Sequence, residues 1–313
     1  MVMSIKSAFA GGFSLVIMVC LMAGCGSLRP LAEMRRAEPC GRIIAIGKDE
    51  VHWREWPGPR ADAPVAVLLH GFASSTSTWD RLAPALARSH RVIAVDLPGN
   101  GLSSRPAGSV AYTPDGQMAM LTKVLEDARV ARFDVVGHSY GGFLALRWAA
   151  REPERIRSVV AIAPPDPGRR ITPRVRPVLA AMLYPVARFL IDSPARLVPA
   201  LELAYGPHAA VPSGMAAHYR DMLLVDGFAR YYFGSMAASE TVENPWQPDR
   251  ITVPVALIWG QDDRVVPITT SGRLADQLAD ALVFPLRDGH MVHEMSADAV
   301  GTIILRHWQP KRQ

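Results

Sequence analysis

Cysteine is scarce in this 313-residue sequence, which contains only Cys20, Cys25 and Cys40. Two of the three lie within the first 25 residues, and a chain processed in that region would keep Cys40 as its one free thiol. A single cysteine excludes a disulfide framework and a cysteine-based zinc site. The hydrophobic residues, which make up 49% of the sequence, are enough for a sizeable core.

Lysine is also rare, with four residues, so the net charge of +5 comes from arginines that are spread along the chain. The sequence lacks a basic stripe interleaved with aromatic residues, which would be the footprint of nucleic-acid binding. It also lacks low-complexity tracts and internal repeats, as expected for a globular protein. We predict no nucleic-acid partner. One arginine cluster is either a solvated patch or a contact for anionic membranes: Arg169, Arg170, Arg174 and Arg176.

The N-terminus is a targeting segment, with one positive charge at Lys6, an apolar run over residues 13–21 and a small-residue ending at Cys25. This ending resembles a bacterial lipobox, which implies a signal peptide over residues 1–24, Cys25 as the lipid anchor and a linker over residues 25–41. The alternative is an uncleaved transmembrane anchor, because about 20 residues can span a bilayer. Both place the body outside the cytoplasm. Gly26 favours the periplasmic face of the outer membrane, because an aspartate there is associated with retention in the inner membrane.

The most informative motif surrounds Ser139. Residues 133–136 form an apolar run that predicts a short buried strand, and residues 143–150 predict a helix. Between them, G-x-S-x-G supplies the glycines that a sharp strand-to-helix turn requires. This context predicts a nucleophile elbow, with the Ser139 hydroxyl at a helix N-terminus that favours developing negative charge.

Strands and helices alternate on both sides of this motif. Strands are predicted over residues 42–46, 50–56, 64–70, 91–96, 131–137, 156–163, 253–259 and 281–286, and helices over residues 79–88, 113–128, 270–279 and 297–307. The alternation predicts βαβ crossovers and a mainly parallel sheet. Residues 167–250 break the pattern with short, proline-cut helical segments. We therefore predict a core over residues 42–166 and 251–313 and a helical cap over residues 167–250.

A serine nucleophile needs a general base and a third group that holds the base in the correct tautomer. The chain order serine, acid, histidine suits this architecture, and His290 follows the last predicted strand. We therefore assign the base to His290. Three other histidines are weaker candidates. His138 adjoins the serine and is expected to direct its side chain elsewhere, His70 lies in the loop after the third strand, and His293 lies beyond the proposed base.

The acid is expected in the segment G-Q-D-D-R-V-V-P, which begins at Gly260 directly after a predicted strand. Asp263 has the spacing of a triad acid, while Asp262 is expected to satisfy turn amides, as aspartate often does. Asp166, after the preceding strand, is an alternative. We choose Asp263.

An oxyanion needs two preorganised N–H donors, one after the nucleophile and one from the loop after the third strand. The backbone amides of Tyr140 and Phe72 occupy these positions, and Gly71 lets the chain approach a substrate. The glycine-rich turn after Asp96 does not fit a phosphate-binding loop, because it lacks the Lys-Ser/Thr ending and G-x-G-x-x-G. Asp96 is expected to be structural.

In this order, the motifs resemble those of the α/β-hydrolase fold family, in the branch with a helical cap. They are H-G-F at His70, D-L-P-G-N-G at Asp96, G-H-S-Y-G-G at Gly137, G-Q-D-D-R-V-V-P at Gly260 and G-H at Gly289. The resemblance implies an α/β fold with a mostly parallel eight-stranded sheet flanked by helices and an inserted cap. It does not specify a substrate. Serine at position 139 argues against dehalogenase and epoxide hydrolase chemistry, which the resemblance associates with aspartate.

These features predict a serine hydrolase that cleaves small-molecule or lipid carboxylic esters through an acyl-enzyme, with no metal or organic cofactor. A carbon–carbon bond or amide hydrolase with the same triad is the alternative enzyme. A ligand-binding protein on the same scaffold is the alternative outside enzymes.

Overall fold

A computed structural model gives the structure of residues 28–38, 40–168, 177–238 and 246–309. The predicted signal peptide, Cys25 and the arginine cluster at residues 169–176 lie outside these described residues.

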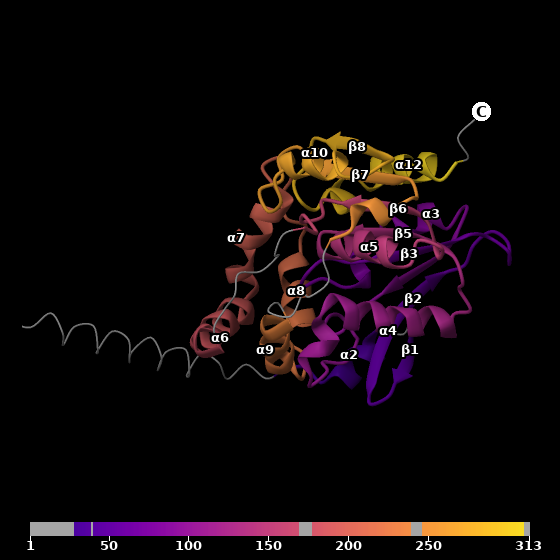
Figure 1. Ribbon diagram of the computed structural model, residues 1–313. Helices are drawn as coiled ribbons and strands as arrows, with labels where there is room; N and C mark the ends of the chain where they lie inside the picture. Colours follow the sequence, from indigo (N-terminus) through magenta and orange to yellow (C-terminus); the bar gives the residue numbers. More distant parts are fainter. Residues whose placement is uncertain (1–27, 39, 169–176, 239–245, 310–313) are drawn as a thin grey trace, which may run out of the picture.

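Eight strands form one sheet in the order β1-β2-β4-β3-β5-β6-β7-β8 (Figure 1). Their bounds are Gly41–Ile46, Asp49–Trp56, Val65–Leu69, Arg91–Val95, Phe133–His138, Ile156–Ile162, Val255–Gly260 and Ala281–Leu286 for β1 to β8. Strand β2 pairs antiparallel with β1 and β4, and all other neighbours are parallel. The predicted mostly parallel eight-stranded sheet is confirmed.

Both faces of the sheet are buried along its central strands, β3 to β7, which explains why these strands are continuous apolar runs. Successive residues alternate between the faces, so Val67 and Val135 join one core while Leu68 and Val136 join the other. The helices that cover the first face are α4 (Pro114–Asp127), α5 (Tyr140–Arg151) and α10 (Thr269–Ala275). Those on the second face are α3 (Ala83–Leu86), α11 (Val292–Met295) and α12 (Ala297–His307). Short 3₁₀ helices span Thr76–Trp79, Ser109–Tyr112 and Pro248–Arg250.

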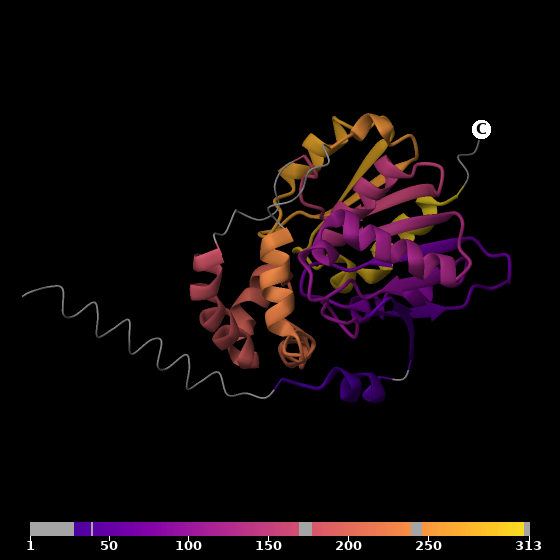
Figure 2. The same cartoon turned by 60° about the horizontal axis from the view of Figure 1, so that its bottom comes forward.

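Among the described residues between β6 and β7, four α-helices stand beside one end of the sheet (Figures 1 and 2). They are α6 (Pro177–Asp192), α7 (Pro194–Tyr205), α8 (Met215–Leu223) and α9 (Phe228–Ala238), and all four fall within the interval predicted as the cap. No single helix among the described residues is long and apolar enough to cross a membrane. Helices α6 and α7 reach the necessary length and composition only together, and they meet at a bend of 93°.

Two segments differ from the sequence-based expectation. The interval predicted as a linker contains the helix α2 (Leu31–Ala37), whose Met34 is buried against Leu102, Met222 and Val225. The helix predicted over residues 79–88 is replaced by two short elements, the 3₁₀ helix Thr76–Trp79 and the four-residue α3. Pro84 is tolerated only in the first turn of a helix, so α3 begins just before it.

Candidate active site

Ser139 occupies a strained turn between β5 and α5. It is the one residue between the end of the strand at His138 and the start of the helix at Tyr140, and it adopts φ 50° and ψ −118°. Positive φ is costly for a residue with a side chain, so the surroundings must enforce it. The Ser139 amide donates to the Ile162 carbonyl at 2.8 Å, and its own carbonyl accepts from the Phe143 amide at 3.0 Å. The predicted elbow geometry is therefore present.

Glycines make this turn possible because backbone segments approach each other closely. A Cβ on Gly141 would lie 2.1 Å from the Leu69 carbonyl oxygen, and one on Gly137 would lie 2.2 Å from that of Gly141. A Cβ on Gly71 would lie 3.2 Å from the Ser139 Cβ. The loop after β3 therefore lies directly against Ser139.

His290 and Asp263 form a buried pair. The His290 Nδ1 lies 2.7 Å from Oδ2 of Asp263, whose side chain is fully buried. A carboxylate can only accept, so Nδ1 carries the proton and Nε2 is left as an acceptor. The other Asp263 oxygen accepts the amides of Val265 and Val266 at 2.8 Å each. The carboxylate is thus fixed in the position that orients the imidazole.

The other two candidate acids have different partners. The Asp262 carboxylate lies 2.9 Å from Nε2 of His208, which belongs to the segment after α7, and Asp166 accepts the Gly168 amide at 2.9 Å. The expectation that Asp262 satisfies turn amides was wrong, since the turn amides go to Asp263.

The histidines that were not chosen as the base form a buried cluster around it. His138 donates from Nε2 to the His290 carbonyl at 3.0 Å, so its side chain supports the segment that carries His290. Burial lowers the pKa of His138 well below its ordinary value, and the charges of His293 and His290 lower it further. His293 contacts the Thr78 hydroxyl at 2.7 Å, and burial, with the charge of His290, lowers its pKa to about 3.

His70 and Asp96 hold the loops around the site. His70 donates from Nδ1 to the Gly71 carbonyl at 2.7 Å and accepts the Leu97 amide at Nε2, which fixes a neutral ring. Asp96 accepts from His52 at 2.7 Å and from the amides of Thr76 and Leu102. Burial by itself would raise the pKa of Asp96, but the hydrogen bond and charge of His52, together with His70 and the Leu102 amide, outweigh burial and lower that pKa. These contacts agree with the structural role expected for Asp96.

Phe72 and Tyr140 flank Ser139 from two different elements. Tyr140 is the first residue of α5, so its amide is one of those that have no acceptor within the helix. Phe72 directly follows Gly71 in the loop against Ser139. The residue is 62% exposed, and its ring stacks on that of Tyr231 of α9 with 6.1 Å between the ring centroids. The Tyr140 ring stacks on Phe143 at 5.6 Å, and burial raises the pKa of its hydroxyl. Phe72 and Tyr140 therefore occupy the positions predicted for the oxyanion donors, and their rings pack against neighbouring aromatic rings.

A cavity of about 650 Å³ adjoins the loop after β3 and the segment after His290. Glu294 on its wall is nearly buried and accepts hydrogen bonds from the hydroxyls of Thr78 and Tyr205. Burial raises the pKa of Glu294, although those two hydrogen bonds act in the opposite direction. Sequence analysis missed Glu294. Its position four residues after His290 gave no sign that Tyr205 of the cap would contact it.

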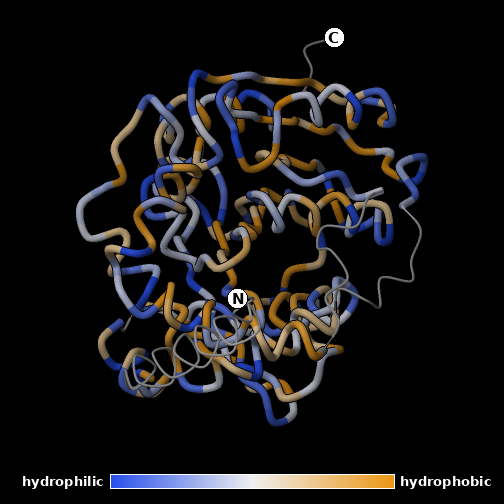
Figure 3. Tube along the Cα trace, turned by 90° about the vertical axis from the view of Figure 1, so that its left-hand side faces the viewer, coloured by the Kyte–Doolittle hydropathy of each residue, from blue (hydrophilic) through white to orange (hydrophobic). Residues whose placement is uncertain are grey.

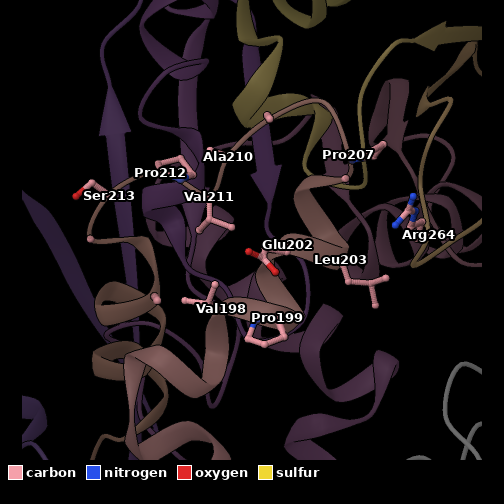
Figure 4. A pocket seen from close by; sticks show the side chains of 14 residues that line it. Val198, Pro199, Glu202, Leu203, Pro207, Ala210, Val211, Pro212, Ser213 and Arg264 are labelled. Carbon is pink, nitrogen blue, oxygen red and sulfur yellow. The ribbon is translucent and has the colours of Figure 1, made fainter.

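A second cavity, of about 740 Å³, is formed by α7, the segment after it and the loop after β7 (Figure 4). Aliphatic and proline side chains make up most of its wall, with Glu202 and Arg264 as its charged members. Neither cavity includes Ser139 in its wall as far as the described residues show. The cavity of about 650 Å³ lies nearer to His290 and Asp263, because the residues that follow Phe72 and His290 in the chain border it.

Comparison with curated proteins gives relatives over most of the chain. The sequence is 32% identical to the magnesium-chelatase 30 kDa subunit of Rhodobacter capsulatus, over 79% of this chain and 87% of the relative. It is 28% identical to a 2-hydroxy-6-oxo-2,4-heptadienoate hydrolase of Pseudomonas putida, over 75% and 83% respectively. It is 25% identical to a poly(3-hydroxyalkanoate) depolymerase of Ectopseudomonas oleovorans, over 87% and 93%.

Solved structures share the fold at low identity. The enol-lactonase of Burkholderia xenovorans LB400 superposes with a TM-score of 0.71 at 23% identity, covering 85% of this chain and 99% of the enzyme. A membrane phospholipase A gives a TM-score of 0.69 at 20% identity, covering 96% and 95%. The family model of the alpha/beta hydrolase fold matches residues 64–297, a range that includes Ser139, Asp263 and His290. The chain belongs to the α/β-hydrolase fold family.

Proposed function

We propose that the protein is a serine hydrolase that cleaves carboxylic esters through an acyl-enzyme. The observation that carries this proposal is the buried His290–Asp263 pair at 2.7 Å, joined through His138 to the strained turn at Ser139. A strained serine, an oriented imidazole and a fixed carboxylate are the three groups that serine-based acyl transfer needs.

In this mechanism Ser139 Oγ attacks the ester carbonyl while Nε2 of His290 accepts its proton. Asp263 holds the imidazole through Nδ1 and stabilises the imidazolium that forms. The amides of Phe72 and Tyr140 donate to the oxyanion. His290 then returns the proton to the leaving alcohol, and a water molecule, activated by the same base, releases the acid.

The neutral histidines around His290 favour this cycle. His138 and His293 are buried, and their lowered pKa values keep both rings uncharged at neutral pH. An uncharged neighbour does not repel the positive charge that His290 acquires in the transition state. The cluster therefore supports a base that must become an imidazolium once in each half-reaction.

The proposed substrate is a small-molecule or lipid ester, and the proposed location is the periplasmic face of the outer membrane, attached through Cys25. The name of one relative, a poly(3-hydroxyalkanoate) depolymerase, describes the cleavage of a polyester. The apolar run and the lipobox-like ending of residues 1–25 support the attachment.

Hydrolysis of p-nitrophenyl esters from acetyl to palmitoyl by the full-length chain in detergent tests this function. We expect turnover that falls at least about 10³-fold in Ser139→Ala, with the melting temperature retained. The chain-length optimum would then size the acyl pocket. Equal turnover by both proteins, or none by either, would contradict an esterase that uses Ser139.

A carbon–carbon bond hydrolase is the second candidate, favoured by the relative named 2-hydroxy-6-oxo-2,4-heptadienoate hydrolase. Its discriminating assay is the loss of absorbance of a 2-hydroxy-6-oxo-dienoate, measured beside the ester series. Consumption of the dienoate without ester turnover would select this function. A physiological response that survives Ser139→Ala would instead select a binding protein on the same scaffold.

A further inference from the structure

The side of α6 that faces away from the rest of the cap is apolar and open to solvent. Its large aliphatic side chains, which we call the outer α6 face, are 40% to 73% exposed and recur at helical spacing: Val178, Leu179, Met182, Leu183, Val186 and Leu190. Soluble monomers rarely expose a contiguous apolar patch of this kind unless it contacts a partner or a membrane.

The opposite side of α6 is already occupied. Tyr184 and Ile191 pack in a cluster with Phe228 and Tyr232 of α9. Among the described residues of α6, the charged side chains are Arg188 and Asp192, and they pair with each other at 2.9 Å. The outer α6 face is therefore an uninterrupted apolar surface beyond what the fold of the cap requires.

The first described residues are fixed to this same part of the cap. Arg29 forms a parallel bridge with Val225, donating to the Leu224 carbonyl at 2.9 Å, and its guanidinium pairs with Asp221 at 2.8 Å. Leu28 packs into the cluster that holds the inner side of α6. The chain therefore enters the fold at the cap.

Chain length then limits how far the cap can stand from the membrane. Cys25 precedes Leu28 by three residues, which reach about 10 Å at most. A lipid on Cys25 would hold Leu28 within that distance of the bilayer surface, and would therefore keep the cluster into which Leu28 packs, with its residues from α6 and α9, close to the membrane. A spanning segment that ends near residue 27 would impose the same limit.

We propose that the outer α6 face lies in the interfacial layer of the bilayer to which the N-terminus is attached, so that the cap faces the membrane. The partner is a lipid surface, and the proposal rests on the membrane attachment in the proposed function. Helix α6 is about 24 Å long, shorter than the roughly 30 Å hydrocarbon core, which suits a helix lying along the surface. After the 93° bend, α7 turns away toward its cavity. Figure 3 views the molecule from the cap side, with each described residue of the backbone trace coloured by hydropathy.

Photocrosslinking of the full-length chain tests the orientation. The photoreactive residue p-benzoylphenylalanine replaces Met182 on the outer α6 face or, as the matched control, Thr302, an exposed residue of α12, which lies at the opposite end of the molecule (Figure 1). Each protein is reconstituted in phosphatidylcholine–phosphatidylglycerol vesicles, floated on a gradient and irradiated, and lipid adducts are identified by mass spectrometry. Hydrolysis of p-nitrophenyl acetate is measured on the same samples.

Flotation with at least fivefold more lipid adduct at position 182 than at position 302 is the expected result. Flotation with equal adduct at both positions, or crosslinking of position 182 to a second copy of the chain, overturns the docking of α6 and leaves the membrane attachment standing. Absence of flotation overturns both. Ester hydrolysis in these samples reports separately on the proposed chemistry, because neither substituted residue belongs to the catalytic machinery.

Discussion

Asp262 and Asp263 are neighbours in the sequence, but the fold gives them different tasks. The Asp263 side chain is buried and serves His290 and two backbone amides, whereas that of Asp262 is 40% exposed and pairs with His208. An exposed polar contact of this kind contributes little to stability, because water screens it. A buried carboxylate that orients a base governs the tautomer on which catalysis depends.

We therefore predict that Asp263→Asn lowers kcat by about 10⁴-fold with little change in melting temperature. The asparagine oxygen can still accept the turn amides, but its NH₂ would face Nδ1 and shift the imidazole proton to Nε2, where it blocks acceptance from Ser139. Turnover of the preferred p-nitrophenyl ester, with a thermal melt, measures both effects. Asp262→Asn is the matched control and should retain wild-type kcat. If Asp263→Asn kept its turnover and Asp166→Asn lost it, the acid would be misassigned.

The sequence contained enough information to propose Ser139, His290 and Asp263, because each follows a recognisable strand and the chain order constrains their roles. It could not show the support around them. His138 contacts the carbonyl of a residue 152 positions away, and Tyr205 reaches Glu294 across 89 positions. Such contacts depend on where the cap and the last loops pack, and no local pattern encodes that placement.

At the scale of elements, the elbow depends on how closely α5 approaches β3. A Cβ on Gly141 would meet the backbone oxygens of Leu69 and His70 at 2.1 and 2.6 Å, and backbone atoms of a central strand cannot give way. We predict that Gly141→Ala destabilises the fold by roughly 1–3 kcal/mol and impairs turnover, since it forces the helix away from the sheet.

Gly272→Ala is the control for this substitution. Gly272 also lies in a helix, α10, but a Cβ there would meet no atom within 4 Å. Alanine should stabilise this position by about 0.5–1 kcal/mol through its higher helix propensity. Urea unfolding of the three proteins measures the difference, and equal midpoints for Gly141→Ala and the wild type would refute the argument from close packing.

The elements that the sequence predicted best are those with the strongest pattern. Strand β8 and helix α12 have the predicted bounds, because each is a continuous apolar or periodic run between clear turn residues. Helix α2 was missed because it buries one side chain, Met34, and is therefore almost free of periodicity. Its partners Leu102, Met222 and Val225 come from distant parts of the chain, so tertiary packing decides whether it forms.

At the scale of the whole molecule, the fold buries His70, His138 and His293 between the sheet and the loops that carry the site. Burial is the largest influence on all three, and it lowers their pKa values from 6.5, to about 3 for His293. The folded protein keeps these rings neutral at a pH where the unfolded chain protonates them. Stability is therefore full above about pH 6.5 and is lost as the pH falls toward the lowered values.

We predict that the free energy of unfolding falls as the pH is lowered from 6.5 to 4.5, and that His293→Gln makes this slope shallower by about one proton, or about 1.4 kcal/mol per pH unit. Glutamine can donate to Thr78 in place of Nε2 but cannot titrate. Above its ordinary pKa of 4.5, Glu294 acts in the opposite direction, because its raised pKa keeps a proton on the folded protein. Glu294 titrates in both proteins, so the difference between their slopes reports chiefly on His293. Urea unfolding of His293→Gln and the wild type at several pH values gives the two slopes. Identical slopes for His293→Gln and the wild type would mean that His293 does not stay neutral in the folded protein. The interpretation that the histidines around His290 are uncharged would then be wrong.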